Sequence, residues 1–117
     1  MSYIRHLPIE KAFELGDEVA YLPGQVVSKT VAQNEALSIT IFAFDKEEEI
    51  STHASHGDAL VMVLDGKARI TIDGKAYVVE AGQSILMPAG KPHALFALES
   101  FKMMLTVVFP EEKRAKK

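Results

Sequence analysis

The sequence predicts an all-β domain, a sandwich or barrel of short strands with the strand count of a jelly roll. Three observations predict this class. After Gly24 the chain consists of short apolar segments, turn residues separate them at intervals of roughly 8–12 residues, and no window keeps the 3.6-residue period of an amphipathic helix. About eight or nine strands in such a length are typical of sandwiches and barrels.

The segment that precedes the strands is the one place where a helix is predicted. Pro8 to Leu15 has helix-compatible residues with proline at its start, and Gly16 would end the helix after about two turns. We therefore expect a short N-terminal segment, helical or irregular. The 117 residues form a single predicted domain, residues 1–117, with the barrel core at about 24–109.

The first two predicted strands are Gln25–Val31 and Leu37–Phe44. Residues 33–35 between them, Gln-Asn-Glu, favour a turn, which predicts a hairpin. A third strand at Leu60–Leu64 is followed by a turn at residues 65–66 and a return strand.

The return strand is Ala68–Ile72, and the Asp73-Gly74 pair after it supplies the positive φ angles of a tight type I′ hairpin. Ala68–Ile72 and Ala76–Val79 should therefore be antiparallel neighbours. Ser84–Met87 follows as a strand, and two prolines in residues 88–92 predict a sharp loop. Phe101–Phe109 closes the predicted barrel.

Composition excludes several classes of function. Hydrophobic residues make up 48% and charged residues 25%, as in ordinary globular proteins. The net charge of −3 does not favour nucleic acid, and the basic residues 113–117 are expected to be a solvated end. The absence of cysteine excludes disulfides and thiolate chemistry. A polar N-terminus and the lack of a run of roughly 20 apolar residues predict a cytoplasmic protein without membrane contact.

One motif carries a family resemblance. Gly82 is followed after five residues by Pro-Ala-Gly at 88–90 and, after two more, by His93. With this spacing the chain resembles the cupin superfamily, matching its second motif nearly residue for residue. The departure is Ala97, which stands where asparagine often occurs. The resemblance spans about residues 37–109 and implies a double-stranded β-helix, the RmlC-like jelly roll of small single-domain conserved-barrel cupins.

The first family motif is His-x-His, three or four residues, Glu, six residues and Gly. It would occupy about residues 47–66, with the second motif at 82–97. Counting back from Gly66, His53 stands in the first histidine position, whereas Ser55 and Ala59 stand in the second histidine and glutamate positions. His56 lies one residue beyond the second histidine position, and Asp58 lies one residue before the glutamate position.

The resemblance implies a metal site at the barrel mouth, with His53, His56 and His93 as ligands and Asp58 as a further candidate. Histidine ligands suit a divalent transition metal, Zn, Mn, Fe, Ni or Cu, and no organic cofactor is implied. Because His53 and His56 are three residues apart, a regular strand would direct them to opposite faces, so a bulge near Gly57 is needed. In the alternative, these two histidines bond to the backbone at the loop edge and His93 packs beneath the barrel. His6 is expected at the surface.

The resemblance also assigns strand faces. If residue 59 faces the interior as its family counterpart does, so do Val61 and Val63, and the apolar residues between them face outward. The predicted pocket-lining residues are Ala59, Val61, Met87 and Leu95. Because both faces are apolar, we expect a homodimer to cover the outer one. The alternative cover is the N-terminal segment, residues 3–27.

Three functions are compatible with these residues. The first is a metal-dependent oxygenase, isomerase or lyase that acts on a small molecule. The second is a metal-free domain that binds or senses a small-molecule ligand, favoured by Ala59 in the glutamate position. The third is acid–base catalysis without metal by His56 and Asp58.

Overall fold

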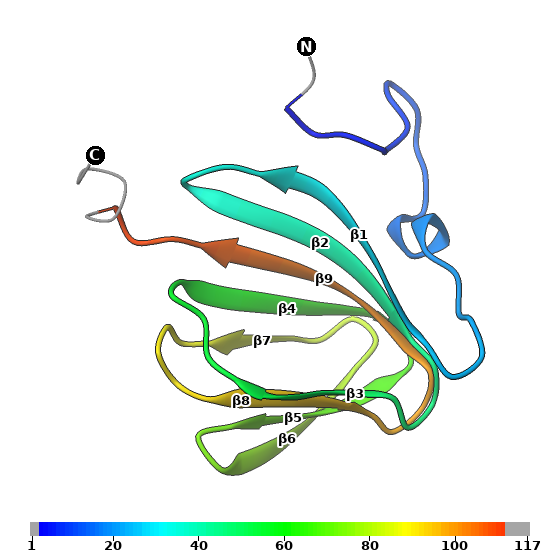
Figure 1. The fold of residues 1–117 in the computed structure, drawn as a ribbon. Coiled ribbons are helices and arrows are strands. Elements are labelled where there is room, and N and C mark those ends of the chain that lie inside the picture. Colours follow the sequence, from blue (N-terminus) through cyan, green and yellow to red (C-terminus); the bar gives the residue numbers. More distant parts are fainter. Residues whose placement is uncertain (1–2, 112–117) are drawn as a thin grey trace.

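A computed structural model describes residues 3–111, in which nine strands form two antiparallel sheets (Figure 1). The five-stranded sheet has the order β1-β2-β9-β4-β7 and the four-stranded sheet the order β3-β8-β5-β6. The strands are β1 (Val26–Gln33), β2 (Leu37–Phe44), β3 (Glu49–His53), β4 (Asp58–Asp65), β5 (Lys67–Ile72), β6 (Lys75–Glu80), β7 (Ser84–Met87), β8 (His93–Ala97) and β9 (Phe101–Val108). This is the jelly-roll architecture that the strand pattern predicted. The basic segment 113–117 lies outside the described residues.

Both predicted hairpins are confirmed. Between β1 and β2, the Asn34 side-chain oxygen accepts hydrogen bonds from the backbone N–H groups of Ala36 and Leu37, at 2.7 and 3.1 Å. Between β5 and β6, Asp73 and Gly74 have φ angles of 50° and 83°, the pair of positive values that a type I′ turn requires. In each case the turn depends on two or three adjacent residues, so the sequence alone indicates it.

The turn at residues 65–66 differs from the prediction of a return strand. β4 pairs with β7 and β9, whereas β5 pairs with β6 and β8 in the other sheet. The chain therefore turns a corner between the sheets here instead of forming a hairpin. Gly66 has a φ of 78°, and a Cβ atom at this position would lie 1.9 Å from the Ser100 carbonyl oxygen. Turn residues predict a change of direction, but the strand partners depend on packing against the β8–β9 turn.

Of the two alternatives predicted for the N-terminal segment, the irregular one is confirmed, and the helix expected for Pro8 to Leu15 does not form. Residues 8–14 are irregular, and the helical element is a single 3-10 turn, η1 (Leu15–Glu18). A two-turn helix is not stable by itself. The segment instead packs apolar side chains on the outer face of β1 and β2, around Ile41 and Ala43, using Leu7, Leu15, Val19 and Tyr21. No helix within residues 3–111 has the length and apolar character to cross a membrane.

The outer face of the five-stranded sheet is only partly covered. The N-terminal segment reaches Leu64 and Met104. This segment, which was the alternative to a homodimer, therefore covers one part of the face. Leu60, Met62 and Leu86 remain 38%, 38% and 53% exposed. A homodimer that buries these three side chains stays a prediction.

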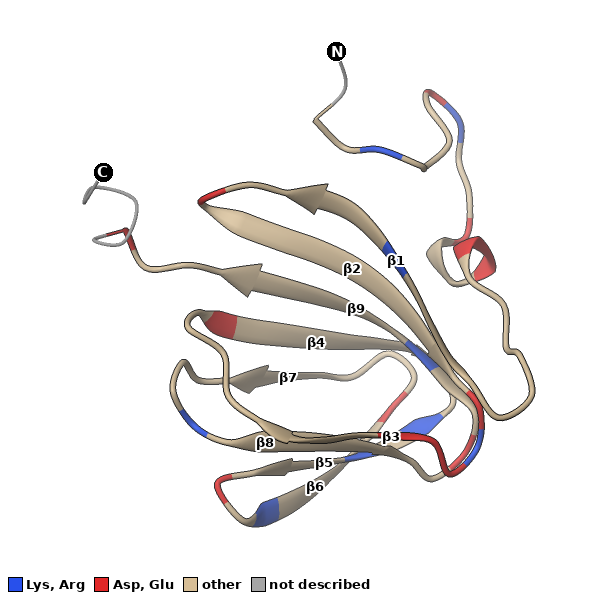
Figure 2. Ribbon diagram, in the orientation of Figure 1, with Lys and Arg blue, Asp and Glu red and all other residues tan. Residues whose placement is uncertain are grey.

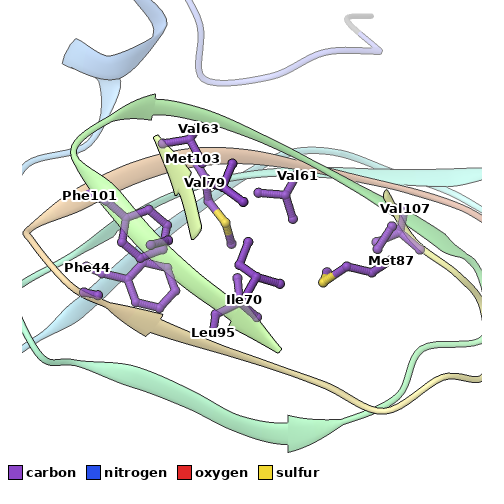
Figure 3. Close-up of a cluster of buried hydrophobic side chains, with 13 residues drawn as sticks. Phe44, Val61, Val63, Ile70, Val79, Met87, Leu95, Phe101, Met103 and Val107 are labelled. Carbon is purple, nitrogen blue, oxygen red and sulfur yellow. The ribbon is translucent and has the colours of Figure 1, made fainter. Parts of the chain in front are cut away.

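The main core fills the space between the two sheets (Figure 3). At one end the rings of Phe44 and Phe101 stack with centroids 4.4 Å apart, and Met87 and Val107 lie toward the other end. Along β4 burial alternates, with Ala59, Val61 and Val63 inside, which confirms the predicted strand faces. The phenylalanine end is therefore closed by packed side chains, while the other end is formed by the loops described next.

Candidate functional site

The two histidines of the family motifs meet at one end of the barrel. His53 is the last residue of β3 and His93 the first residue of β8. The β3–β4 loop, the β5–β6 turn and the β7–β8 loop lie at this same end (Figure 1), which we call the histidine end. The Gly90 N–H donates to the Ser55 carbonyl oxygen at 2.9 Å, so the loops that carry the two histidines are bonded to each other.

A β-bulge directs His53 toward His93. Ile50 pairs with Leu95, and His53 pairs with His93, with a register shift between them. Three residues of β3 therefore oppose two residues of β8. The extra residue reverses the normal alternation of side chains, so His53 lies on the same face of the sheet as His93. The bulge precedes His53, whereas the sequence had suggested one near Gly57.

The two imidazole rings are in direct contact. Their Nε2 atoms are 3.1 Å apart, the ring centroids are 4.4 Å apart, and the rings are nearly perpendicular, at 76°. His53 Nδ1 lies 2.8 Å from the Ser51 carbonyl oxygen. Because a carbonyl oxygen only accepts hydrogen bonds, the tautomer of a neutral His53 that fits this contact has its proton on Nδ1 and a lone pair on Nε2. That lone pair is directed at His93.

His93 is the buried member of the pair. It is 3% exposed, and its Nδ1 atom has no hydrogen-bond partner among the described residues. Burial lowers the pKa of His93, and the neighbouring His53 lowers this pKa further, while the backbone carbonyl of Lys91 acts in the opposite direction. The neutral imidazole is therefore favoured, which is the form that coordinates metals.

If His93 donates its Nε2–H to His53, its Nδ1 becomes an acceptor that is buried without a donor, which costs on the order of 1–3 kcal/mol. A cation held by the two histidines would occupy Nε2 of His93 and leave its proton on Nδ1, so that Nδ1 would no longer be a buried acceptor without a donor. The donor set of the pair, two neutral imidazoles, thus fits a transition-metal ion.

The other predicted ligands do not join the pair. The His56 side chain is exposed, and Asp58 Oδ1 accepts a hydrogen bond of 2.8 Å from the Ala89 N–H. Asp58 thus holds the β7–β8 loop in place, a role that depends on a contact 31 residues away and has no signal in the local sequence. Within residues 3–111, no group of three or more histidine, aspartate or glutamate side chains is arranged to hold a metal. Within residues 3–111, no hydrogen bond joins His56 to Asp58, the pair predicted for acid–base catalysis.

The predicted pocket-lining residues all lie in the barrel interior. Ala59, Val61, Met87 and Leu95 are 1%, 0%, 1% and 3% exposed and belong to the main core. Each packs against other core residues, and their contact with a ligand stays a prediction.

Comparisons with known proteins agree with this fold. Residues 40–109 match the model of the cupin domain family. A conserved protein of unknown function from Streptococcus pyogenes is 50% identical over 95% of this chain and 97% of its own, with a TM-score of 0.92. A cupin superfamily protein from Desulfitobacterium hafniense is 28% identical over 93% and 100%, with a TM-score of 0.89.

A conserved-barrel cupin from Leptotrichia buccalis is 42% identical over 82% of this chain and 47% of its own, with a TM-score of 0.79. No curated protein matches the sequence. The family match covers more than half of the chain and includes both motifs and both contacting histidines. The chain belongs to the cupin domain family.

Proposed function

We propose that the protein binds a divalent transition-metal ion through the Nε2 atoms of His53 and His93. The observation that carries this proposal is the 3.1 Å separation of the two Nε2 atoms. Imidazole nitrogens bind such ions at about 2.0–2.1 Å, so His53 and His93 would be able to hold one ion together.

The proposed function is that of a metal-dependent oxygenase, isomerase or lyase acting on a small molecule. A bound metal would supply Lewis-acid polarisation of a substrate oxygen or activation of a ligand. The chain itself holds the ligands: the Ser51 carbonyl orients His53, and burial keeps His93 neutral. With two protein ligands, other coordination positions remain for solvent and substrate, and His56 is the candidate third ligand from the β3–β4 loop.

The test is metal binding by protein purified without a histidine tag. We expect about one equivalent of Zn²⁺ or Co²⁺ per chain by metal analysis and calorimetric titration, and a loss of roughly 10–100-fold or more in affinity for His53→Ala and His93→Ala. His6→Asn is the matched control, because His6 has a φ of 64°, which asparagine tolerates. Metal content that stays far below one equivalent after supplementation would overturn the proposal.

Two further variants define the ligand set. His56→Ala weakens binding if His56 completes the site, and Asp58→Asn should leave metal affinity nearly unchanged because Asp58 bonds the Ala89 N–H.

The second candidate function is a metal-free small-molecule binding domain. It is favoured by the absence of any three-ligand group within residues 3–111 and by Ala59 in place of a carboxylate ligand. This candidate predicts that ligand binding does not change when metal is removed with a chelator. Stoichiometric metal together with substrate turnover would contradict it.

A further inference from the structure

The two sheets leave a gap between β6 and β7. β6 is the edge strand of one sheet and β7 the edge strand of the other. A cavity of about 450 Å³ opens between them, a volume in the usual range for small-molecule sites. Its lining comes from β5, β6, β7 and the adjoining loops: Ile72, Asp73, Lys75, Tyr77, Ile85, Leu86, Pro88 and Lys91.

The inner wall of this cavity is apolar. Ile72 and Ile85 are partly buried and pack against the main core, and the Tyr77 ring, 37% exposed, lines the side formed by β6. A hydrocarbon or aromatic group placed against these three side chains would be removed from water on one side, which favours binding.

The rim carries an excess of positive charge. Figure 2 shows basic residues at the start of β6 and in the β7–β8 loop, which are Lys75 and Lys91. The acidic side chain in the lining is Asp73, whose Oδ2 lies 3.9 Å from Lys91 Nζ, with both side chains more than half exposed. Such a long, exposed ion pair is weak. Lys75 Nζ lies over the Tyr77 ring, 5.4 Å from its centre, and this contact leaves the charge of the ammonium group without a carboxylate partner among the described residues.

The cavity is next to the histidine pair. Ile72 is the direct partner of His93 in the β5–β8 ladder, and the Asp73 N–H donates to the Pro92 carbonyl at 2.8 Å. Lys91 lies in the β7–β8 loop, two residues before His93. A ligand in this cavity would therefore lie beside the residues that position His93.

We propose that this cavity binds a small amphipathic monocarboxylate. Its carboxylate pairs with the ammonium groups of Lys75 and Lys91, and its aromatic or branched hydrocarbon body lies against Ile72, Tyr77 and Ile85. Two lysines and one aspartate give the lining a single net positive charge, which one carboxylate neutralises. This site goes beyond the proposed metal binding, because none of its contacts requires a metal.

The test uses the full chain after chelator treatment and three probes of similar shape: 3-phenylpropionate, 3-phenylpropan-1-ol and 3-phenylpropylamine. Binding is measured by calorimetry and by NMR chemical shifts at low salt. We expect the carboxylate to bind about 10-fold more tightly than the alcohol, with the amine weakest, since the difference depends on the lysine charges. Equal affinity for carboxylate and alcohol would overturn the proposal.

Variants place the binding site. Lys75→Gln and Lys91→Gln should each weaken carboxylate binding by about 3–10-fold and leave alcohol binding unchanged. Lys67→Gln is the matched control, because Lys67 also forms an exposed ion pair of 3.9 Å, with Glu99, away from the cavity. An equal effect of Lys67→Gln contradicts the assignment. Carboxylate binding that appears only after metal is added would assign the ligand to the metal and also overturn this proposal. A failure to bind metal leaves the expected results unchanged.

Discussion

The two ends of the barrel share one topology but differ in what fills them. At the phenylalanine end, Phe44 and Phe101 are fully buried and stacked at 4.4 Å. At the histidine end, the buried polar residue His93 retains an Nδ1 atom without a partner among the described residues, and the exposed His53 contacts it. The first end is packed for stability. The second keeps a polar pair that reduces the stability of the metal-free protein, as expected of a functional site.

Two glycine turns, one at each end of the barrel, differ in how closely they are packed. A Cβ atom at Gly66, at the phenylalanine end, would lie 1.9 Å from the Ser100 carbonyl oxygen, whereas a Cβ at Gly74, at the histidine end, would have no atom within 4 Å. The β4–β5 turn is thus closely packed, whereas the β5–β6 turn is open to solvent.

The largest effect should come from Phe101→Ala. Removing this buried ring leaves a cavity against Phe44 and is expected to lower the free energy of unfolding by about 3–5 kcal/mol, measured by chemical denaturation. His53→Ala in the metal-free protein should cost less than about 1 kcal/mol, because His53 is exposed. Similar losses for the two variants would contradict the contrast between the ends.

The glycine turns provide a second, matched comparison. Gly66→Ala should lower stability by about 2–4 kcal/mol, because the new Cβ overlaps backbone atoms in addition to the cost of its positive φ. Gly74→Ala has a similar φ of 83° without the overlap, so the expected loss is about 1–2 kcal/mol. Equal thermal unfolding shifts for both would show that the β4–β5 corner relaxes.

A third variant has opposite effects on stability and binding. His93→Leu replaces a buried polar atom that lacks a partner with an apolar side chain. We expect the metal-free protein to be unchanged or stabilised by up to about 1 kcal/mol, and stabilisation by added Zn²⁺ to disappear. Thermal unfolding with and without metal measures both effects. A loss of several kcal/mol without metal would mean that the imidazole is satisfied in solution.

The smallest effect should be a pH dependence of the metal-free protein. Since the pKa of His93 lies below its ordinary value of 6.5, the unfolded chain binds more protons than the folded protein between that value and the folded-state pKa. The contribution of His93 to the free energy of unfolding is complete above its ordinary pKa. It decreases as the pH falls from that value to the folded-state pKa, and it is constant at lower pH.

Unfolding free energies from about pH 7.5 to about pH 5 test this. His93→Leu is the control, because it removes the titrating group. An identical pH slope in wild type and His93→Leu would assign the dependence to other residues.

Features that depend on neighbouring residues could be predicted from the sequence. The Asp73-Gly74 hairpin follows from local turn geometry, and alternating burial in β4 follows from the strand period. The second motif also placed His93 at the start of a strand after a sharp loop. The N-terminal helix does not form because packing against Ile41 and Ala43 outweighed a weak local preference.

The sequence alone determined the all-β class, the two hairpins and the position of His93, because each depends on short-range backbone preferences. Only the tertiary structure decided that β4 and β5 belong to different sheets, that Asp58 bonds the Ala89 N–H, and that a bulge directs His53 toward His93. These features depend on contacts between residues far apart in the chain, and a bulge of one residue reverses which face a side chain occupies.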